Sequence, residues 1–205
     1  MSSIEQFYDR VGSLYDWAER FEGNAKSMAF DRLMVSRGDR VLNVGAGTGI
    51  DHAKLTRQVG STGVVVALDL SSVMLRLVRE RTGQPVVRAD ARSLPFCDQS
   101  FDDLFCSYVL DLIAGSDLLE ALREFHRVLR PDGRIAVITM TEGITMVSKG
   151  LIAMWNHLYR VSPIACGGCR PVRLSPLMGS AGFHGVTRDV VVEAGFPSQI
   201  IIATR

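Results

Sequence analysis

The chain has 205 residues, of which 47% are hydrophobic and 22% are charged, a composition typical of a folded globular protein. Its 23 basic and 22 acidic side chains give a net charge of +1, so no bulk field attracts nucleic acid or anionic lipid. The longest stretch without a charged side chain, residues 174–187, is too short to cross a membrane. The first twenty residues carry six charges and lack the apolar core of a signal peptide, so we expect a cytoplasmic location.

The first 36 residues differ in pattern from the rest of the chain. Apolar side chains recur there at helical spacing, at Ile4, Phe7, Val11, Leu14 and Ala18. We therefore expect a helical cover over residues 1–36 and an α/β domain over residues 37–205, together forming one structural unit.

Beyond residue 36, short β-branched runs alternate with amphipathic segments. Strands are expected at residues 40–44, 63–68, 85–89, 102–108, 134–139, 186–192 and 199–203, and helices at residues 51–59, 72–81, 118–129 and 175–181. This alternation predicts a Rossmann-like, doubly wound and mostly parallel sheet. So few residues separate the last two strands that they suit a hairpin, which makes the last of seven strands antiparallel.

A long apolar segment at residues 144–161 has three readings. Its helical stripe comprises Ile144, Val147, Leu151, Met154 or Trp155, and Leu158. The first expectation is a helix that faces the core. The alternatives are a lid over a lipophilic acceptor, helped by the adaptable Met146, Met154 and Met178, and a contact with a membrane surface.

Glycine dominates the turn after the first expected strand. Gly45, Gly47 and Gly49 follow a G-x-G-x-G pattern, which lets the backbone turn tightly and approach a ligand closely. Ile50 stands where a dinucleotide fingerprint requires glycine, and no Gly-Lys-Ser/Thr follows, so neither a pyrophosphate nor a triphosphate cradle is indicated. A tight turn without any ligand is the alternative.

Acidic residues end the next two expected strands. Asp69 lies 20 residues beyond Gly49, where a carboxylate can accept both hydroxyls of a ribose. Asp90 ends the third strand, where it can accept from an adenine amino group. The alternative role for each of these carboxylates is to cap a helix. For Asp69 this alternative is supported by Ser71, which follows it at the expected start of the next helix. One nucleoside without phosphates fits all three loops.

Four segments in this order resemble the motifs of class I S-adenosylmethionine-dependent methyltransferases. They are VLNVGAGTG at residues 41–49, ALDLSSVML at 67–75, RADARSLPF with SFDD at 88–103, and EFHRVLRPDG at 124–133. The closest resemblance is to the ubiquinone/menaquinone-biosynthesis group, whose Tyr-Asp pattern is similar to residues 8–16. The resemblance covers the chain from about residue 7 to its end.

The resemblance implies S-adenosylmethionine as cofactor. Asp69 would hold the ribose hydroxyls and Asp90 the adenine amino group, while Ser107 and Tyr108 face the sulfonium end and Tyr15 closes over it. Asn43 stands where many members of the family have Asp or Glu. The complete set of cofactor residues implied is Tyr15, Asn43, Gly45, Ala46, Gly47, Gly49, Asp69, Leu70, Met74, Asp90, Ala91 and Ser107.

Catalysis by such an enzyme is mainly positioning, with a general base for some acceptors. Asp111 follows the fourth strand at the expected mouth of the site and is our first candidate base, with a structural cap or ion pair as the alternative. Tyr15 and Tyr108 are expected to orient the acceptor, and His52 to be solvated. The family's quinone enzymes carry Arg-Asn where this chain has residues 110–112, Leu-Asp-Leu, which speaks against a quinone ring.

Cys166 and Cys169 frame two glycines. Such a pair can be half of a zinc site or a redox-active pair. The sequence lacks a second Cys pair to complete a zinc site. We therefore favour a tight glycine loop at the pocket rim and expect no metal.

The sequence thus predicts methyl transfer from S-adenosylmethionine to a small, lipophilic molecule, with no nucleic acid partner because the chain has no basic stripe. Peripheral membrane contact is compatible with this reading. One alternative is a cofactor-binding regulatory or partner protein without methyl transfer. The other is a nicotinamide oxidoreductase, against which Ile50 speaks.

Overall fold

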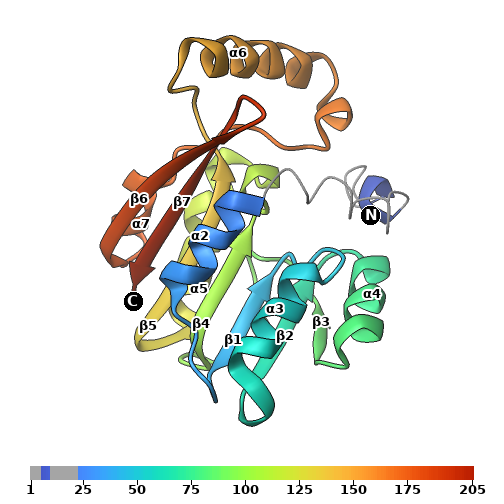
Figure 1. Cartoon of the computed structure of the whole chain (residues 1–205), viewed down its shortest axis with the longest axis vertical. Helices are drawn as coiled ribbons and strands as arrows, with labels where there is room; N and C mark the ends of the chain where they lie inside the picture. The colour runs from blue at the N-terminus through green and yellow to red at the C-terminus, as the bar shows by residue number, and fades with distance from the viewer. Residues whose placement is uncertain (1–5, 10–22) are drawn as a thin grey trace.

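The computed structural model describes residues 6–9 and 23–205. Its centre is a seven-stranded sheet of order β3-β2-β1-β4-β5-β7-β6 (Figure 1). The strands are β1 (Arg40–Val44), β2 (Val64–Asp69), β3 (Val86–Arg88), β4 (Phe101–Ser107), β5 (Leu129–Met140), β6 (His184–Glu193) and β7 (Phe196–Thr204). The first five pair in parallel, and β7 pairs antiparallel with both β5 and β6. The predicted sheet and its antiparallel hairpin are confirmed.

Helices cover both faces of this sheet (Figure 1). They are α2 (Gly23–Leu33), α3 (Ile50–Val59), α4 (Ser72–Thr82), α5 (Leu118–Val128), α6 (Met146–Val161) and α7 (Ser175–Ser180). On one face, Phe30 of α2 stacks on Phe105 of β4 with 4.7 Å between ring centroids. On the other, Phe125 of α5 and Met178 of α7 are fully buried beside Leu104. The boundary between residues 36 and 37 stays a prediction, since part of the expected cover lies outside the described residues.

Strand β5 begins earlier than the sequence predicts. Helix α5 ends at Val128, and the segment expected to form a turn, Pro131-Asp132-Gly133, is instead the start of a strand of 12 residues. The register between β4 and β5 shifts between Phe101 and Asp103, and this irregularity absorbs the extra residues. Asp132 adopts a positive φ of 62°, which Asp tolerates better than most side chains.

Helix α6 differs from our first expectation for residues 144–161. It begins with a capping box in which the Thr145 and Ser148 side chains each bond the other's backbone N–H. Within α6 only Ser148 and Ile152 are buried, so a core-facing stripe is wrong for most of its apolar side chains. Met178, expected to contribute to a lid, is fully buried in the core. No helix in the described part of the chain is long and apolar enough to span a membrane.

Candidate active site

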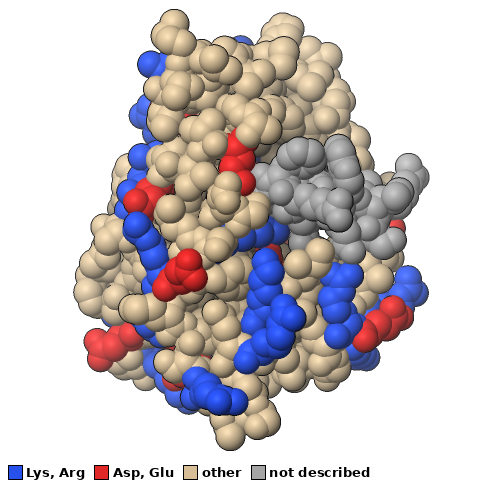
Figure 2. Space-filling model, in the orientation of Figure 1, with Lys and Arg blue, Asp and Glu red and all other residues tan. Residues whose placement is uncertain are grey.

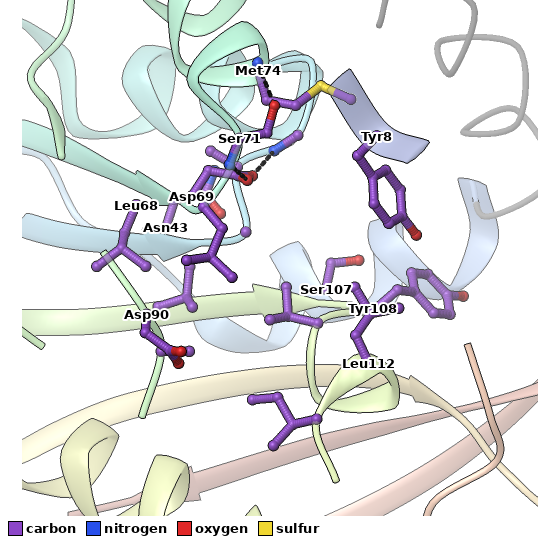
Figure 3. A pocket seen from close by; sticks show the side chains of 18 of the residues that line it. Tyr8, Asn43, Leu68, Asp69, Ser71, Met74, Asp90, Ser107, Tyr108 and Leu112 are labelled. Atoms are coloured by element: carbon purple, nitrogen blue, oxygen red, sulfur yellow. Dashed lines mark hydrogen bonds between the residues drawn. The ribbon is translucent and has the colours of Figure 1, made fainter. Parts of the chain in front are cut away.

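A pocket of about 420 Å³ opens at the carboxyl ends of β1, β2 and β4. Parallel strands present their loops at this edge, which is where doubly wound sheets bind ligands. Its lining comes from Tyr8, from Lys26 of α2, and from the loops that follow β1, β2, β3 and β4, and Figure 3 shows many of these side chains. The lining residues are Tyr8, Lys26, Asn43, Val44, Gly45, Ala46, Gly47, Asp51, Leu68, Asp69, Leu70, Ser71, Met74, Ala89, Asp90, Ala91, Arg92, Phe105, Ser107, Tyr108, Val109, Leu112, Ile113 and Ala114.

The loop after β1 requires glycine. Gly45 has a φ of +68°, and a Cβ placed on it would lie 1.9 Å from Cγ2 of Val109. The backbone N–H groups of Gly45 and Ala46 both donate to the carbonyl of Leu68, at 2.7 and 3.2 Å, which ties the loop to β2. Gly49 is left-handed and caps α3. The backbone therefore forms one wall of the pocket directly, with no side chain between it and a ligand.

Asp69 ends β2 in the centre of this pocket. Its Oδ2 accepts from the backbone N–H of Gly47 at 3.1 Å and its Oδ1 from that of Ser71 at 2.9 Å (Figure 3). Burial raises the pKa of Asp69 to about 6, and the nearby Asp9 carboxylate acts in the same direction. Each oxygen keeps a lone pair that can accept from a ligand hydroxyl. Ser71 also caps α4 through Met74 N–H, so the predicted cap is present as well.

Asp90 also lines the pocket but is paired. Both its carboxylate oxygens accept from the guanidinium of Arg92, at 2.6 and 3.0 Å, and this contact lowers the pKa of Asp90. Arg92 in turn reaches Asp117 at 2.8 Å. Ala91 beside it is buried. Asp90 is thus fixed in place with lone pairs still available toward the pocket.

Ser107 is a polar residue in the pocket lining, and Leu70 and Met74 are apolar residues in it. The Oγ atom of Ser107, at the end of β4, is buried and has no hydrogen-bond partner among the described residues. A buried hydroxyl without a partner is costly, so a ligand that bonds it would be stabilised. Leu70 and Met74 provide apolar surface on the Asp69 side, with Met74 almost completely buried.

A buried ion pair in this pocket was missed by the sequence analysis. Lys26 of α2 lies 2.9 Å from Asp51 of α3, and their side chains are only 6% and 9% exposed. Both residues line the pocket. The sequence contains only a weak indication of this ion pair. Lys26 lies among the buried residues Ala25, Ala29 and Phe30 on one face of α2. A helix face cannot be assigned to a pocket before the fold is known.

Tyr8 lies at the rim of the pocket, while Tyr15, the tyrosine predicted to close over the site, lies outside the described residues. The Tyr8 hydroxyl donates to the carbonyl of Gly167 at 3.1 Å. Gly167 and Gly168 both have positive φ, and Cys166 is buried beside them. The expected glycine loop at the pocket rim is therefore confirmed.

Asp111 does not fit the role of a general base that we expected. It lies in the 3₁₀ turn Leu110–Leu112, is fully buried and is not part of the pocket lining. Its Oδ2 accepts from the backbone N–H of Met140 at 2.9 Å, at the end of β5. The carboxylate therefore has a structural role, although this bond is neither the cap nor the ion pair weighed as the alternative. Tyr108 does line the pocket, and its hydroxyl lies 2.7 Å from that of Ser198.

His52 is a second correction. Expected in solvent, it is fully buried in α3, and burial lowers its pKa to about 4. Its Nδ1 lies 3.4 Å from the amide nitrogen of Asn43 on β1. Asn43 lines the pocket and so connects it to a neutral histidine.

Comparison with known proteins agrees with this geometry. A family model described as a methyltransferase domain matches residues 42–137. The ubiquinone/menaquinone biosynthesis C-methyltransferase UbiE of Escherichia coli O1:K1 is 37% identical over 185 residues, which cover 84% of this chain and 72% of that relative. A methyltransferase from Aquifex aeolicus has a TM-score of 0.64 at 20% identity, over 87% of this chain and 88% of that one. YcgJ from Bacillus subtilis has a TM-score of 0.68 at 19% identity, over 89% and 98%.

The fold and the glycine-rich pocket, with these likenesses, define an enzyme of the class I S-adenosylmethionine-dependent methyltransferases. The chain belongs to the family that includes UbiE. Its cofactor is S-adenosylmethionine, and the residues present fit it. The pocket combines a buried carboxylate at Asp69, a glycine wall at Gly45 and an unpartnered hydroxyl at Ser107. The bound cofactor supplies an activated methyl group; the protein supplies binding and orientation.

Proposed function

We propose that the chain methylates a carbon atom of a small, lipophilic acceptor. The observation that carries this proposal is the apolar part of the pocket, formed by Val109, Leu112 and Ile113. The two cations that line the pocket are in ion pairs, Lys26 with Asp51 and Arg92 with Asp90. Such a wall favours an uncharged, apolar acceptor over an anionic one. The C-methyltransferase activity in the name of UbiE supports carbon as the atom methylated.

We assign the cofactor's nucleoside end to the second and third strands. Asp69 accepts from the ribose hydroxyls and Asp90 from the adenine amino group, with Leu70, Met74 and Ala91 against the purine. Asp69 is already oriented by two backbone N–H groups, so it binds without rearrangement.

The amino-acid end of the cofactor belongs to the first loop and the adjacent ion pair. Gly45, Ala46, Gly47 and Gly49 let its methionine part lie against the backbone, beside Asn43 and Ser107. Lys26 and Asp51 offer one positive and one negative group, which complements a carboxylate and an ammonium group. Tyr15 closing over this end stays a prediction.

The bound cofactor would supply the methyl group by direct displacement: the acceptor carbon would form the new bond as the sulfur–methyl bond breaks, leaving S-adenosylhomocysteine, and the proton displaced from that carbon would be released to solvent. The chain's task is to hold donor and acceptor in line and to exclude water. The hydroxyls of Tyr8 and Tyr108 lie at the apolar end of the pocket and are our candidates to orient a polar group of the acceptor (Figure 3).

The test is product analysis with a deuterated methyl donor. The purified protein is incubated with a panel of acceptors: a prenylated quinol, its parent without the side chain, a catechol and a primary amine. We expect a deuterated methyl on carbon in a lipophilic member and an equal amount of S-adenosylhomocysteine. Turnover of the amine alone would refute the acceptor class. Tight cofactor binding with no turnover of any acceptor would favour a regulatory protein.

A further inference from the structure

Helix α6 is held to the molecule along one side only. The Trp155 ring packs edge-on against Phe196 of β7 at 5.3 Å, and its N–H donates to the carbonyl of Cys169 at 2.9 Å. Ile152 is buried on the same side, and Leu151 contacts the hairpin turn at Gly195. Figure 1 shows α6 lying across one end of the molecule, beyond the β6–β7 hairpin.

A neighbouring side of α6 is apolar and exposed. Met146 is 84% exposed, Val147 69%, Met154 62% and Val161 73%, and Leu158 is exposed as well. At 100° per residue these side chains fall within about one third of the helix circumference, apart from the side that contacts the hairpin. We call this set the outer face of α6. In Figure 2 the end of the molecule at which α6 lies is mostly tan, the colour of residues other than Lys, Arg, Asp and Glu.

Two basic side chains lie beside the outer face, and helix α6 itself contains no acidic residue. Lys149 and Arg160 are exposed along one edge of the helix. The sequence from residue 143 to 188 contains five Lys or Arg residues and no Asp or Glu. The carboxylates that flank this stretch are paired: Glu142 with Arg173, and Asp189 with Arg32.

We propose that the outer face of α6 docks on the surface of an anionic lipid bilayer. The large apolar side chains can enter the acyl region of a bilayer, while the neighbouring cations contact its negative headgroups. The helix has no carboxylate that would repel those headgroups. A protein partner could be bound by the apolar side chains of the outer face alone. The basic side chains beside that face therefore favour a membrane with anionic lipid headgroups. The net charge of +1 does not oppose this, because the attraction is local to one helix and is screened within about 10 Å.

Docking through α6 would also bring the pocket rim to the bilayer. The 3₁₀ turn that follows α6, Pro163–Cys166, leads into Gly167, which accepts from the Tyr8 hydroxyl. Tyr8 lines the pocket. A lipophilic acceptor could then pass from the membrane to the site with little exposure to water. The docking itself does not depend on the proposed acceptor, since it rests on the helix alone.

The test is vesicle co-sedimentation of the whole chain with matched variants. Met154→Glu places a charge on the outer face, and Met34→Glu is its control, because Met34 is 63% exposed on a different surface. Vesicles of phosphatidylcholine with about 30% phosphatidylglycerol are compared with pure phosphatidylcholine. Titration with S-adenosylhomocysteine and the melting temperature verify that each variant is folded.

We expect binding to the anionic vesicles, at least tenfold weaker for Met154→Glu, unchanged for Met34→Glu, and weakened by salt. Absent binding, equal binding to neutral vesicles, or equal loss in both variants would overturn the proposal. So would a dimer of the wild type that Met154→Glu dissociates, since the outer face would then cover a second copy. Cofactor binding and acceptor turnover are separate readouts, so failure here is distinguishable from failure of the proposed function.

Discussion

Affinity for the cofactor should fall on mild acidification because of Asp69. Its pKa of about 6 in the free protein means that the carboxylate is ionised at neutral pH and protonated near pH 5. A protonated carboxyl loses acceptor capacity for ribose hydroxyls. If only the ionised form binds, the dissociation constant rises by a factor of about 1 + 10^(6 − pH), which is roughly elevenfold at pH 5 and about 10% at pH 7.

The same shift has a consequence of opposite sign for the free protein. Because the folded pKa lies above the usual 3.8, the folded state binds this proton more tightly than the unfolded chain does. The resulting stabilisation is complete below pH 3.8 and is lost as the pH rises through 6, by an amount on the order of 3 kcal/mol. Cofactor binding, which favours the ionised form, should therefore stabilise the protein most at neutral pH.

The assay is calorimetric titration with S-adenosylhomocysteine between pH 5 and 7.5, with NAD as a negative control. Asp69→Asn cannot ionise, so its affinity should be weaker by about 10- to 100-fold, the worth of a lost charge-assisted bond, and independent of pH in this range. Asp31→Asn, on the exposed side of α2, should behave as the wild type. A wild-type affinity that is flat from pH 5 to 7.5, or an undiminished affinity in Asp69→Asn, refutes the assignment.

Three further outcomes are expected. Lys26→Met leaves the buried Asp51 with only the more distant and partly exposed Lys54, at 3.8 Å, and should destabilise the fold by about 3 kcal/mol in urea unfolding, part of which Asp51→Leu should restore. Gly45→Ala places a Cβ against Val109 at positive φ and should weaken S-adenosylhomocysteine binding at least tenfold in calorimetry; wild-type affinity would contradict the close approach. His52, with a pKa of about 4, stays neutral when folded, so its own contribution to stability should fall by up to about 3 kcal/mol between pH 6.5 and 4, opposite in sign to that of Asp69; the difference in stability between the wild type and His52→Gln in urea melts should change by this amount, and a difference independent of pH would exclude the histidine.

The sheet could be predicted because its signals are local. Most of the seven strands are short apolar runs rich in β-branched residues and bounded by glycine, proline or polar residues, and the prediction placed all seven. The glycine loop and Asp69 were also predictable, since a strand, a tight turn and a carboxylate after the next strand must meet at one edge of a parallel sheet. The start of β5 was misplaced most, by five residues, because a register shift is a property of two strands together; β7 also begins three residues earlier than predicted.

Helix α6 and Lys26 could not be placed in this way, since a periodic pattern defines a face but not what covers it. The apolar stripe of residues 144–161 predicted a helix correctly and its burial wrongly. No pattern in the sequence predicted that helix α2 places Lys26 beside Asp51 at the pocket. Burial depends on the elements that pack around a helix, and these come from distant parts of the sequence.

Asp69 and Asp111 show how equivalent positions acquire different roles. Each follows the carboxyl end of a central strand, the position that predicts a binding-site residue in this fold. After β2 the chain turns directly into α4, and the Ser71 N–H holds the Asp69 carboxylate toward the pocket. After β4 a 3₁₀ turn intervenes, and the Asp111 carboxylate turns away to satisfy the N–H of Met140 on β5. The turn that follows a strand, and the backbone donors that it presents, therefore decide whether a carboxylate serves the ligand or the fold.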